Sequence, residues 1–207
     1  MCAGCFLKIK ILDAQECFNC GRWSETGETC RACKAEVQLD GLIVAADYRG
    51  KIISQLVKLL KYNFIEDIAP ILAKIILKQL SLSAEFETRN NLIIMPVPLH
   101  PKRERWRGFN QAELIARAVA AGLDKTVDAK SLARIRNIKP QTRFNQEERR
   151  ENVRDCFSFT GDKQNIKGKI VLLIDDVVTT GATISECAKA LKAAGAKTVW
   201  AVAVARG

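Results

Sequence analysis

The segment between Lys169 and Ile184, KIVLLIDDVVTTGATI, combines residue types that could bind a phosphorylated ligand. Two adjacent carboxylates, Asp175 and Asp176, follow an apolar run. The turn after them is small and rich in hydroxyl groups: Thr179, Thr180, Gly181, Ala182 and Thr183. Carboxylates accept hydrogen bonds from hydroxyls or bind a divalent cation, whereas the free backbone N–H groups at a helix N-terminus bind phosphate. Because a sugar phosphate carries both hydroxyls and a phosphate, this pattern predicts a sugar-phosphate site.

Two other interpretations exist for this segment. The carboxylates could be an incidental pair at the end of a buried strand, followed by a capped helix. A Walker-type nucleotide site is not expected, because the chain contains no GxxxxGK[ST] run.

A second candidate segment, PVPLHPKRERWRGFNQAE between Pro96 and Glu113, is strongly basic. Its cations are Lys102, Arg103, Arg105 and Arg107. They precede a helix predicted to begin near Gln111, and several cations near a helix N-terminus suit a pyrophosphate group or a nucleic-acid backbone. The window from Lys102 to Arg154 contains 14 Lys and Arg against 7 Asp and Glu, a net charge of +7 in a chain of net charge +10. This window indicates an anionic ligand or nucleic acid, with a solvated basic face as the alternative.

The aromatic residues and the single histidine of this segment leave the chemistry open. Trp106 and Phe109 could stack on bases or sugars, or could pack the loop. His100, the only histidine, is more typical of a turn than of a general base. The sequence has no convincing Ser/His/Asp or Cys/His arrangement, so chemistry would depend on positioning and electrostatics rather than on a nucleophilic side chain.

The first 36 residues contain six of the eight cysteines. Two CxxC knuckles are formed by Cys17, Cys20, Cys30 and Cys33. Such spacing can place four thiolates around Zn²⁺ in a closed, structural site, and the alternative for these pairs is redox chemistry. Cys2 and Cys5 form a third pair, which could share the site with the first knuckle or be half of a site whose other half is absent from this chain. Cys156 and Cys187 are expected to be buried as small hydrophobes.

The elements that must position these groups alternate between strands and helices. Strands are predicted over Gly41–Tyr48, at the start of Asn91–Pro101, and over Leu132–Ile135, Cys156–Phe159, Lys169–Ile174 and Thr198–Val204. Helices are predicted over Lys51–Tyr62, Asp67–Leu80, Gln111–Gly122 and Thr183–Ala194, with a short charged helix before Cys156. The alternation predicts an α/β protein with a parallel sheet that ends in a βαβ unit, and Cys156–Phe159 is expected as an edge strand.

A chain of 207 residues can bury one good core and carry a small appendage. We expect residues 1–38 to form a Cys-rich zinc-binding module and residues 39–207 to form the main domain. Every apolar run is far shorter than the roughly 20 residues of a membrane-spanning helix, and the N-terminus lacks a signal pattern. We therefore expect a cytoplasmic protein without membrane insertion, in which the cysteines are reduced thiols or metal ligands.

The run VLLIDDVVTTGAT resembles the fingerprint of the type I phosphoribosyltransferases, which bind 5-phosphoribosyl-1-pyrophosphate (PRPP). The resemblance implies the type I phosphoribosyltransferase fold for residues 39–207, with a central parallel sheet flanked by helices. It implies that Asp175 and Asp176 bind the 2′- and 3′-hydroxyls of the ribose. It also implies that Thr179–Thr183 bind the 5′-phosphate.

The same resemblance implies a reaction. It is a Mg²⁺-assisted displacement at the anomeric carbon of PRPP, in which pyrophosphate leaves. Arg103 and Arg107 would screen the charge of the leaving group. The catalytic candidates are therefore Asp175, Asp176, Arg103 and Arg107.

Two segments are similar to the ComF/ComFC group of phosphoribosyltransferase-like proteins, which is associated with DNA uptake in bacterial competence. One is the basic segment Pro96–Glu113, and the other is KPQTRFNQEERRENVRDCF, Lys139–Phe157. The matching positions of the second are Pro140, Gln141, Arg149, Asn152, Val153 and Phe157. Members of that group commonly carry N-terminal CxxC knuckles, as this chain does. The resemblance implies that PRPP or a related ribose phosphate is the ligand and that the protein is linked to DNA uptake.

Two kinds of function remain open on these grounds. The first is a phosphoribosyltransferase with an unknown acceptor. The second is a non-catalytic module that handles single-stranded DNA or senses PRPP and retains the sugar-phosphate pocket. The sequence identifies neither an acceptor base nor an oligomeric state.

Overall fold

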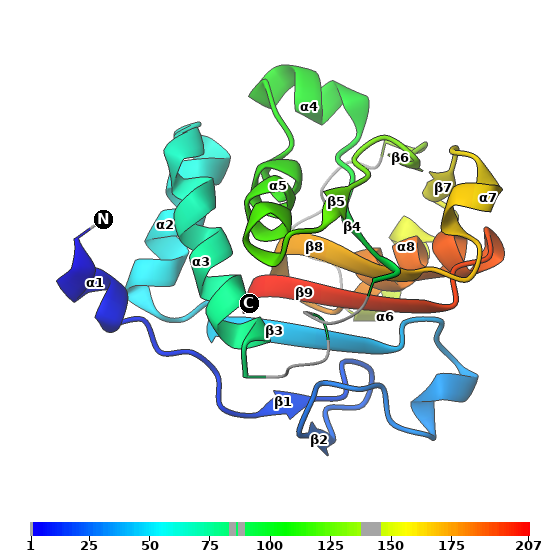
Figure 1. Cartoon of the computed structure of the whole chain (residues 1–207), viewed down its shortest axis with the longest axis horizontal. Coiled ribbons are helices and arrows are strands. Elements are labelled where there is room, and N and C mark those ends of the chain that lie inside the picture. The colour runs from blue at the N-terminus through cyan, green and yellow to red at the C-terminus, as the bar shows by residue number, and fades with distance from the viewer. Residues whose placement is uncertain (1, 83–85, 87–89, 138–145) are drawn as a thin grey trace.

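A five-stranded parallel sheet forms the centre of the computed structural model, which describes residues 2–82, 86, 90–137 and 146–207 (Figure 1). The strand order is β3-β9-β8-β4-β5. The strands are β3 (Gly41–Asp47), β4 (Leu92–Pro96), β5 (Thr126–Val127), β8 (Ile170–Val178) and β9 (Thr198–Arg206). All four neighbouring pairs are parallel, which confirms the predicted parallel α/β sheet.

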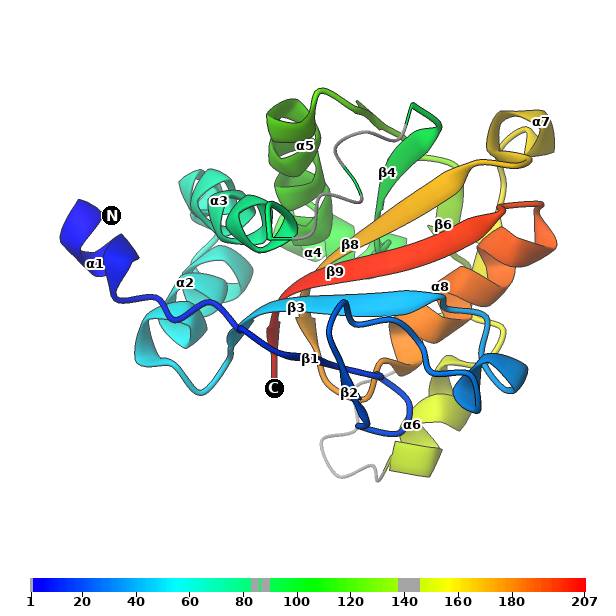
Figure 2. The same cartoon turned by 60° about the horizontal axis from the view of Figure 1, so that its bottom comes forward.

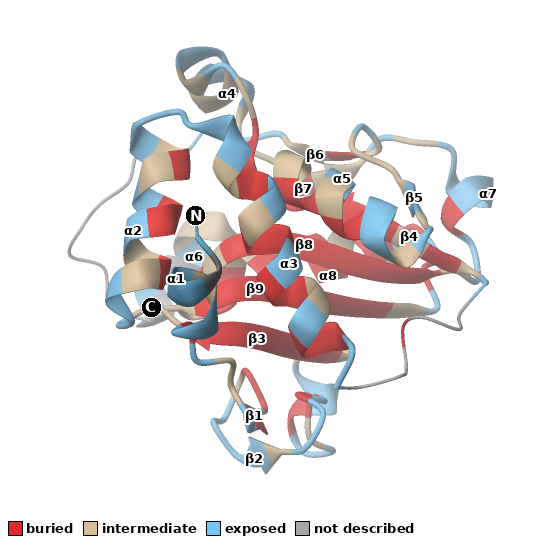
Figure 3. Cartoon of the chain, turned by 60° about the vertical axis from the view of Figure 1, so that its left-hand side comes forward, coloured by how far each residue is buried: buried red, intermediate tan, exposed pale blue. Residues whose placement is uncertain are grey.

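Helices cover both faces of this sheet (Figure 2). One face is covered by α2 (Lys51–Tyr62), α3 (Ala69–Leu80) and α5 (Gln111–Leu123), and the other by α8 (Ala182–Ala193). The side chains of β8 alternate between the two cores. Leu172 and Ile174 pack with α2, α3 and α5, whereas Val171 and Leu173 pack with α8. A central strand with helices on both faces must be apolar on both sides, as β8 is (Figure 3).

The helices that cover the first face follow the predicted pattern closely. α2 has the predicted bounds and buries Ile53, Leu56, Val57 and Leu60, which recur at helical spacing. α3 begins at Ala69 rather than at Asp67, because Glu66–Ile68 form a separate 3₁₀ turn before it. Pro70 lies in the first turn of this helix, where its missing N–H costs no intrahelical hydrogen bond.

Two elements differ from the sequence-based expectation. The strand predicted near Cys156 is β7 (Phe157–Phe159), which pairs antiparallel with β6 (Leu132–Arg134) in a separate two-stranded sheet beside α8. The edge strands of the main sheet are β3 and β5 instead. The segment expected as a basic loop contains α4 (Pro101–Arg107), a helix that stands clear of the sheet (Figure 1). Three further helices, all short, are α1 (Ala3–Leu7), α6 (Gln146–Val153) and α7 (Lys163–Ile166).

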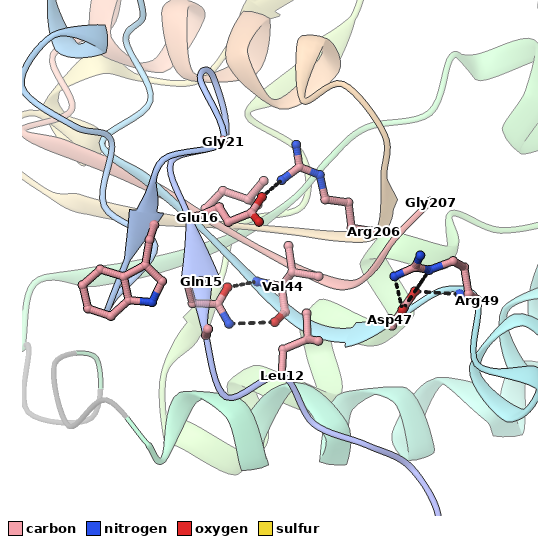
Figure 4. A pocket seen from close by; sticks show the side chains of 12 residues that line it. Leu12, Gln15, Glu16, Gly21, Val44, Asp47, Arg49, Arg206 and Gly207 are labelled. Atoms are coloured by element: carbon pink, nitrogen blue, oxygen red, sulfur yellow. Dashed lines mark hydrogen bonds and ion pairs between the residues drawn. The ribbon is translucent and has the colours of Figure 1, made fainter.

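The Cys-rich segment lies along the free edge of β3 (Figure 2). It contains the two-residue strands β1 (Gln15–Glu16) and β2 (Trp23–Ser24) and a 3₁₀ turn at Cys33–Ala35. The buried side-chain amide of Gln15 donates to Val44 O at 3.1 Å and accepts from Val44 N at 2.8 Å (Figure 4). A side chain therefore makes the two hydrogen bonds that a neighbouring strand would otherwise make with Val44.

No helix within the described residues is long and apolar enough to cross a membrane.

Gly41, the first residue of β3, has no room for a larger side chain because it lies opposite Trp200 of β9. A Cβ on Gly41 would lie 2.2 Å from Cζ3 of Trp200, whose ring also contacts Phe86 edge-to-face at 5.5 Å. We expect Gly41→Ala to lower the free energy of unfolding by about 1–3 kcal/mol, because the indole must shift out of a packed core. Urea unfolding measures this, with Gly4→Ala as the control, since no atom lies within 4 Å of a Cβ there. Equal unfolding midpoints for the two variants would contradict the packing limit.

Candidate functional site

The carboxyl ends of β4 and β8 lie side by side where the connections that follow them diverge, a position that we call the crevice. The two strands are neighbours, and their pairing runs from Leu92↔Ile170 to Pro96↔Ile174. The chain leaves β4 through α4 and α5 toward β5 on one side, and leaves β8 through α8 toward β9 on the other side. In an open α/β sheet, ligands bind where neighbouring connections diverge in this way. The predicted acids follow Ile174, and the predicted arginines lie on α4, so the crevice gathers both groups.

The two acids lie inside β8 rather than after it, because the strand continues to Val178 instead of ending at Ile174. It remains paired with β9 there, for example at Asp175↔Ala203. Adjacent residues in a strand point to opposite faces. Asp176 accordingly contacts Lys61 of α2, whereas Asp175 interacts electrostatically with Cys187 of α8. The diol of one ribose would thus have to meet two carboxylates that differ in direction and in burial.

Asp176 is buried, with 2% of its surface exposed, and is paired with a cation that the sequence did not single out. Lys61 Nζ lies 2.8 Å from Asp176 Oδ1. Oδ1 also accepts from Val177 N at 2.6 Å. Oδ2 is buried and has no hydrogen-bond partner among the residues that the structure describes. One oxygen of this carboxylate is therefore occupied, and the other is a buried acceptor with no hydrogen bond in the described part of the chain.

The charges in the crevice shift each other's pKa. Burial, followed by the charge of Asp176, raises the pKa of Asp175 to about 8. Burial alone would lower the pKa of Lys61, but Asp176 and Asp175 outweigh burial and raise it. Lys61 therefore carries its charge at neutral pH, whereas Asp175 keeps its proton to an unusually high pH. This balance leaves the crevice favourable to an anionic ligand.

The predicted arginines of α4 divide into those that face the crevice and those that face solvent. Arg107 is half-buried, its Nη1 donates to Gln111 Oε1, and its Nε has no partner within the described part of the chain. Burial lowers the pKa of Arg107 while Asp176 raises it, so the guanidinium lies within electrostatic reach of that acid. Arg103 is half-buried, whereas Lys102 and Arg105 are exposed.

Arg134 of β6 is a further cation that the sequence analysis missed. Its guanidinium carbon lies 5.4 Å from the centre of the Phe157 ring, and burial followed by Arg103 lowers its pKa. A sequence pattern gives no signal for this residue, because its position beside Phe157 and near Arg103 depends on the β6–β7 pairing. His100 caps α4, since its Nδ1 accepts from Lys102 N at 3.2 Å, and this agrees with the turn role expected for it.

The predicted phosphate turn leads into the N-terminus of α8. Gly181 precedes the helix with φ of +75°, a conformation that favours glycine. A cavity of about 300 Å³ opens beside the turn; its lining includes Phe18, Asn19, Arg154, Thr180, Gly181 and Ser185. Glu36, Glu151 and Glu186 also line this cavity and would repel a phosphate inside it. A phosphate bound by the turn would therefore lie against the backbone N–H groups that begin α8.

Phe18 of the Cys-rich segment packs against this turn. A Cβ on Gly181 would lie 2.8 Å from Cδ2 of Phe18, so a larger residue is excluded by contact as well as by φ. Phe18 is buried and follows Cys17 directly in the chain. The conformation of the predicted phosphate turn is thus tied to that of the first CxxC knuckle.

The two CxxC knuckles bring their sulfur atoms together. The ligand atoms of Cys17, Cys20, Cys30 and Cys33 all lie within 4.8 Å of one another. Burial would raise the pKa of Cys17, but backbone hydrogen bonds from Cys30, Cys20 and Asn19 outweigh it and lower the pKa to about 6. A thiolate held by backbone N–H groups is the form that binds a metal, so these residues fit a four-sulfur Zn²⁺ site.

The other cysteines lie apart from this group. Cys2 and Cys5 are exposed on and beside α1 and are not among the four clustered ligands. Cys156 and Cys187 are buried in the core with α8, as expected of small hydrophobes. Of the ComF-like positions, Pro140 and Gln141 lie outside the described residues, and Arg149 lies in α6.

A larger cavity, about 600 Å³, lies between the Cys-rich segment and the ends of β3 and β9 (Figure 4). It contains none of the predicted site residues. Its two arginines are already paired, Arg49 with Asp47 at 2.8 Å and Arg206 with Glu16 at 3.4 Å. Their charges are therefore already satisfied within the protein, and the cavity does not replace the crevice as the candidate site.

The thiol cluster generates a prediction about metal content. We expect the purified protein to contain about one Zn²⁺ per chain and Cys20→Ser to lose it, because a structural site needs all four thiolates. Elemental analysis measures the ratio of zinc to protein. The double variant Cys2→Ser/Cys5→Ser is the matched control and should keep its zinc. Loss of zinc from the control, with zinc retained by Cys20→Ser, would contradict the assignment.

Comparison with known proteins identifies relatives over most of the chain. The phosphoribosyl transferase domain family matches residues 109–207. Competence protein F of Haemophilus influenzae is 29% identical over 212 residues, covering 98% of this chain and 90% of that protein. The DNA utilization protein YhgH of Salmonella typhimurium is 33% identical over 160 residues, covering 76% and 68%. Competence protein ComFC of Bacillus subtilis is 29% identical over 196 residues, covering 92% and 77%.

Two solved structures also match part of this chain. UMP synthase of Leishmania donovani has a TM-score of 0.38 and 21% identity over 71% of this chain and 24% of that one. The PRPP amidotransferase of B. subtilis has a TM-score of 0.37 and 19% identity over 66% and 25%. The fold assignment rests instead on the parallel sheet and on the phosphoribosyl transferase domain that contains β8, its turn and α8. With relatives at this identity over most of its length, the chain belongs to the ComF/ComFC family of phosphoribosyltransferase-like proteins.

Proposed function

We propose that this protein binds PRPP or a related ribose phosphate in the crevice between β4 and β8, and that it transfers the phosphoribosyl group with release of pyrophosphate. One observation carries the proposal. Paired acids, a glycine turn at the N-terminus of α8 and three cations, Lys61, Arg103 and Arg107, lie together at the carboxyl ends of adjacent parallel strands. A ribose phosphate is a ligand whose hydroxyls and phosphates match all three kinds of group.

The residues have distinct roles in this proposal. The hydroxyls of the ribose donate to Asp175 and to Oδ2 of Asp176, which lacks a partner in the described structure. The turn from Thr179 to Thr183 holds the 5′-phosphate through hydroxyls and backbone N–H groups. Arg103 and Arg107 screen the pyrophosphate as it leaves, which lowers the barrier through electrostatic stabilisation. The acceptor is not specified by these residues.

Magnesium, which the family resemblance implies, does not fit against Asp176 in this structure. Lys61 already holds Oδ1 of that carboxylate at 2.8 Å, and Val177 N donates to the same oxygen at 2.6 Å. A divalent ion at this position would face an ammonium group at close range. The positive charge beside Asp176 is therefore supplied by the protein itself.

Zinc does fit the four clustered thiols. In a closed Cys₄ site it supplies no catalytic coordination position and orders the segment that carries it. In this chain that segment includes Phe18, which packs against Gly181. The role of the metal is thus to hold one wall of the phosphate turn.

A second candidate function is the handling of single-stranded DNA, for which α4 provides a specific observation. Trp106 is 68% exposed and contacts Phe64 edge-to-face at 5.7 Å, beside the exposed cations Lys102 and Arg105. Exposed aromatic rings among cations are typical of surfaces that stack bases and contact phosphates. Relatives named competence and DNA utilization proteins support a link to DNA uptake. We place the protein in the cytoplasm, where free thiols stay reduced.

The transferase proposal is tested by titration calorimetry with ribose 5-phosphate and with PRPP. We expect Asp175→Asn to weaken binding of both by about tenfold at about pH 9, above the pKa of about 8, where Asp175 is ionised, because the change removes a charged acceptor for the ribose hydroxyls. Asp13→Asn is the matched control, since Asp13 is exposed. Failure of the wild-type protein to bind either ligand would end the proposal.

The DNA candidate is tested by fluorescence anisotropy with a labelled single-stranded oligonucleotide across a range of salt concentrations. We expect Trp106→Ala to weaken binding about five- to 100-fold, since stacking contributes about 1–3 kcal/mol per base. Arg105→Ala should reduce the slope of the logarithm of the DNA affinity against the logarithm of the salt concentration. Trp23→Ala is the control, because Trp23 is equally exposed, at 69%, but lies in the Cys-rich segment. Equal effects of the two tryptophan changes would argue against a stacking surface on α4.

A further inference from the structure

The buried pair of Lys61 and Asp176 has a feature that a simple structural ion pair does not need. Its side chains are 20% and 3% exposed, so both charges are largely removed from water. Breaking such a pair by removing one partner leaves an uncompensated buried charge, which is strongly unfavourable. Yet the pair lies at the carboxyl end of β8, in the crevice, and leaves Oδ2 of Asp176 without a described partner. The carboxylate is thus neutralised on one oxygen, while its second oxygen is buried and makes no hydrogen bond within the described residues.

The position of the ammonium group is fixed by the helix that carries it. Lys61 lies in the last turn of α2, where a cation also interacts favourably with the helix dipole. The preceding residue, Leu60, is fully buried, and Val57 one turn earlier is 1% exposed. These buried neighbours hold the backbone at Lys61 in place, and the ion pair with Asp176 holds its ammonium group in the crevice.

A divalent cation and Lys61 would compete for the same place. Mg²⁺ binds carboxylate oxygens at about 2.0–2.1 Å and prefers a full octahedral shell. Lys61 Nζ lies 2.8 Å from Oδ1, and Val177 N donates to the same oxygen at 2.6 Å. Arg107, within electrostatic reach of Asp176, adds a second positive charge on this side. The immediate surroundings of Asp176 already contain more positive than negative charge.

We propose that Lys61 supplies at Asp176 the positive charge that would otherwise come from a divalent cation, so that this protein binds PRPP without Mg²⁺. The inference rests on the proposed function, because it concerns how the same crevice accepts its ligand. Lys61 is a binding residue in this account: it keeps the acid from repelling the phosphates and leaves Oδ2 to accept a ribose hydroxyl.

The test compares the Kd for PRPP in EDTA with the Kd in Mg²⁺, measured by titration calorimetry on the full chain. For the wild-type protein we expect the two values to agree within about threefold. In Lys61→Met, the carboxylate of Asp176 is uncompensated, so we expect the Kd in EDTA to rise about tenfold or more and Mg²⁺ to restore part of the loss. Lys58→Met is the matched control, since Lys58 is exposed on the same helix. Lys61→Arg should keep the wild-type ratio.

A second variant keeps the test decisive if Lys61→Met does not fold. Lys61→Met/Asp176→Asn removes both charges of the pair, so the net charge of the crevice is the same as in the wild-type protein. We expect this variant to bind PRPP more weakly but again with similar Kd values in EDTA and in Mg²⁺. The readout is the ratio of the two constants, and a general loss of stability does not change that ratio.

The failures of the two proposals can be told apart. If the wild-type protein binds ribose 5-phosphate but binds PRPP only with Mg²⁺, the role of Lys61 is wrong and the ribose-phosphate site stands. The role of Lys61 is also wrong if Lys61→Met has the same ratio of Kd in EDTA to Kd in Mg²⁺ as the wild-type protein. If neither ligand binds under any condition, the proposed function fails, and the inference fails with it.

Discussion

A carboxylate buried at the end of a central strand needs a compensating charge, and this requirement connects the distant parts of the molecule. β8 is enclosed by helices on both faces, so Asp176 lies in a region with little water. The compensating charge comes from Lys61, more than 100 residues earlier in the chain, at the end of α2. The packing of α2 on the sheet and the electrostatics of the crevice therefore depend on each other.

Much of the architecture follows from the sequence because it depends on local periodicity. The apolar spacing in Lys51–Tyr62 defined α2, and the apolar runs near Ile170 and Thr198 predicted two adjacent parallel strands. The doubled CxxC spacing likewise predicted the four clustered thiols. These features are encoded within short segments, where the geometry of a helix, strand or knuckle fixes the spacing.

The remaining features depend on tertiary contacts. The length of β8 could not be predicted, because its last four residues are held in the strand by pairing with β9. α4 was expected as a loop, since its prolines and charges give no apolar face, and a lone histidine caps it. Lys61 and Arg134 were missed because a cation beside an apolar face is usually solvated. Only the folded chain brings Lys61 to Asp176 and Arg134 to Phe157.

The side chain of Gln15 has a consequence for how the chain avoids association with other chains. β3 is a seven-residue strand, GLIVAAD, at the rim of the sheet, and its outer hydrogen-bonding edge is covered by the Cys-rich segment. That segment is held by thiols rather than by a large core. Oxidation of those thiols would release the cover and leave an apolar strand with unpaired amides, a surface that templates intermolecular β-pairing.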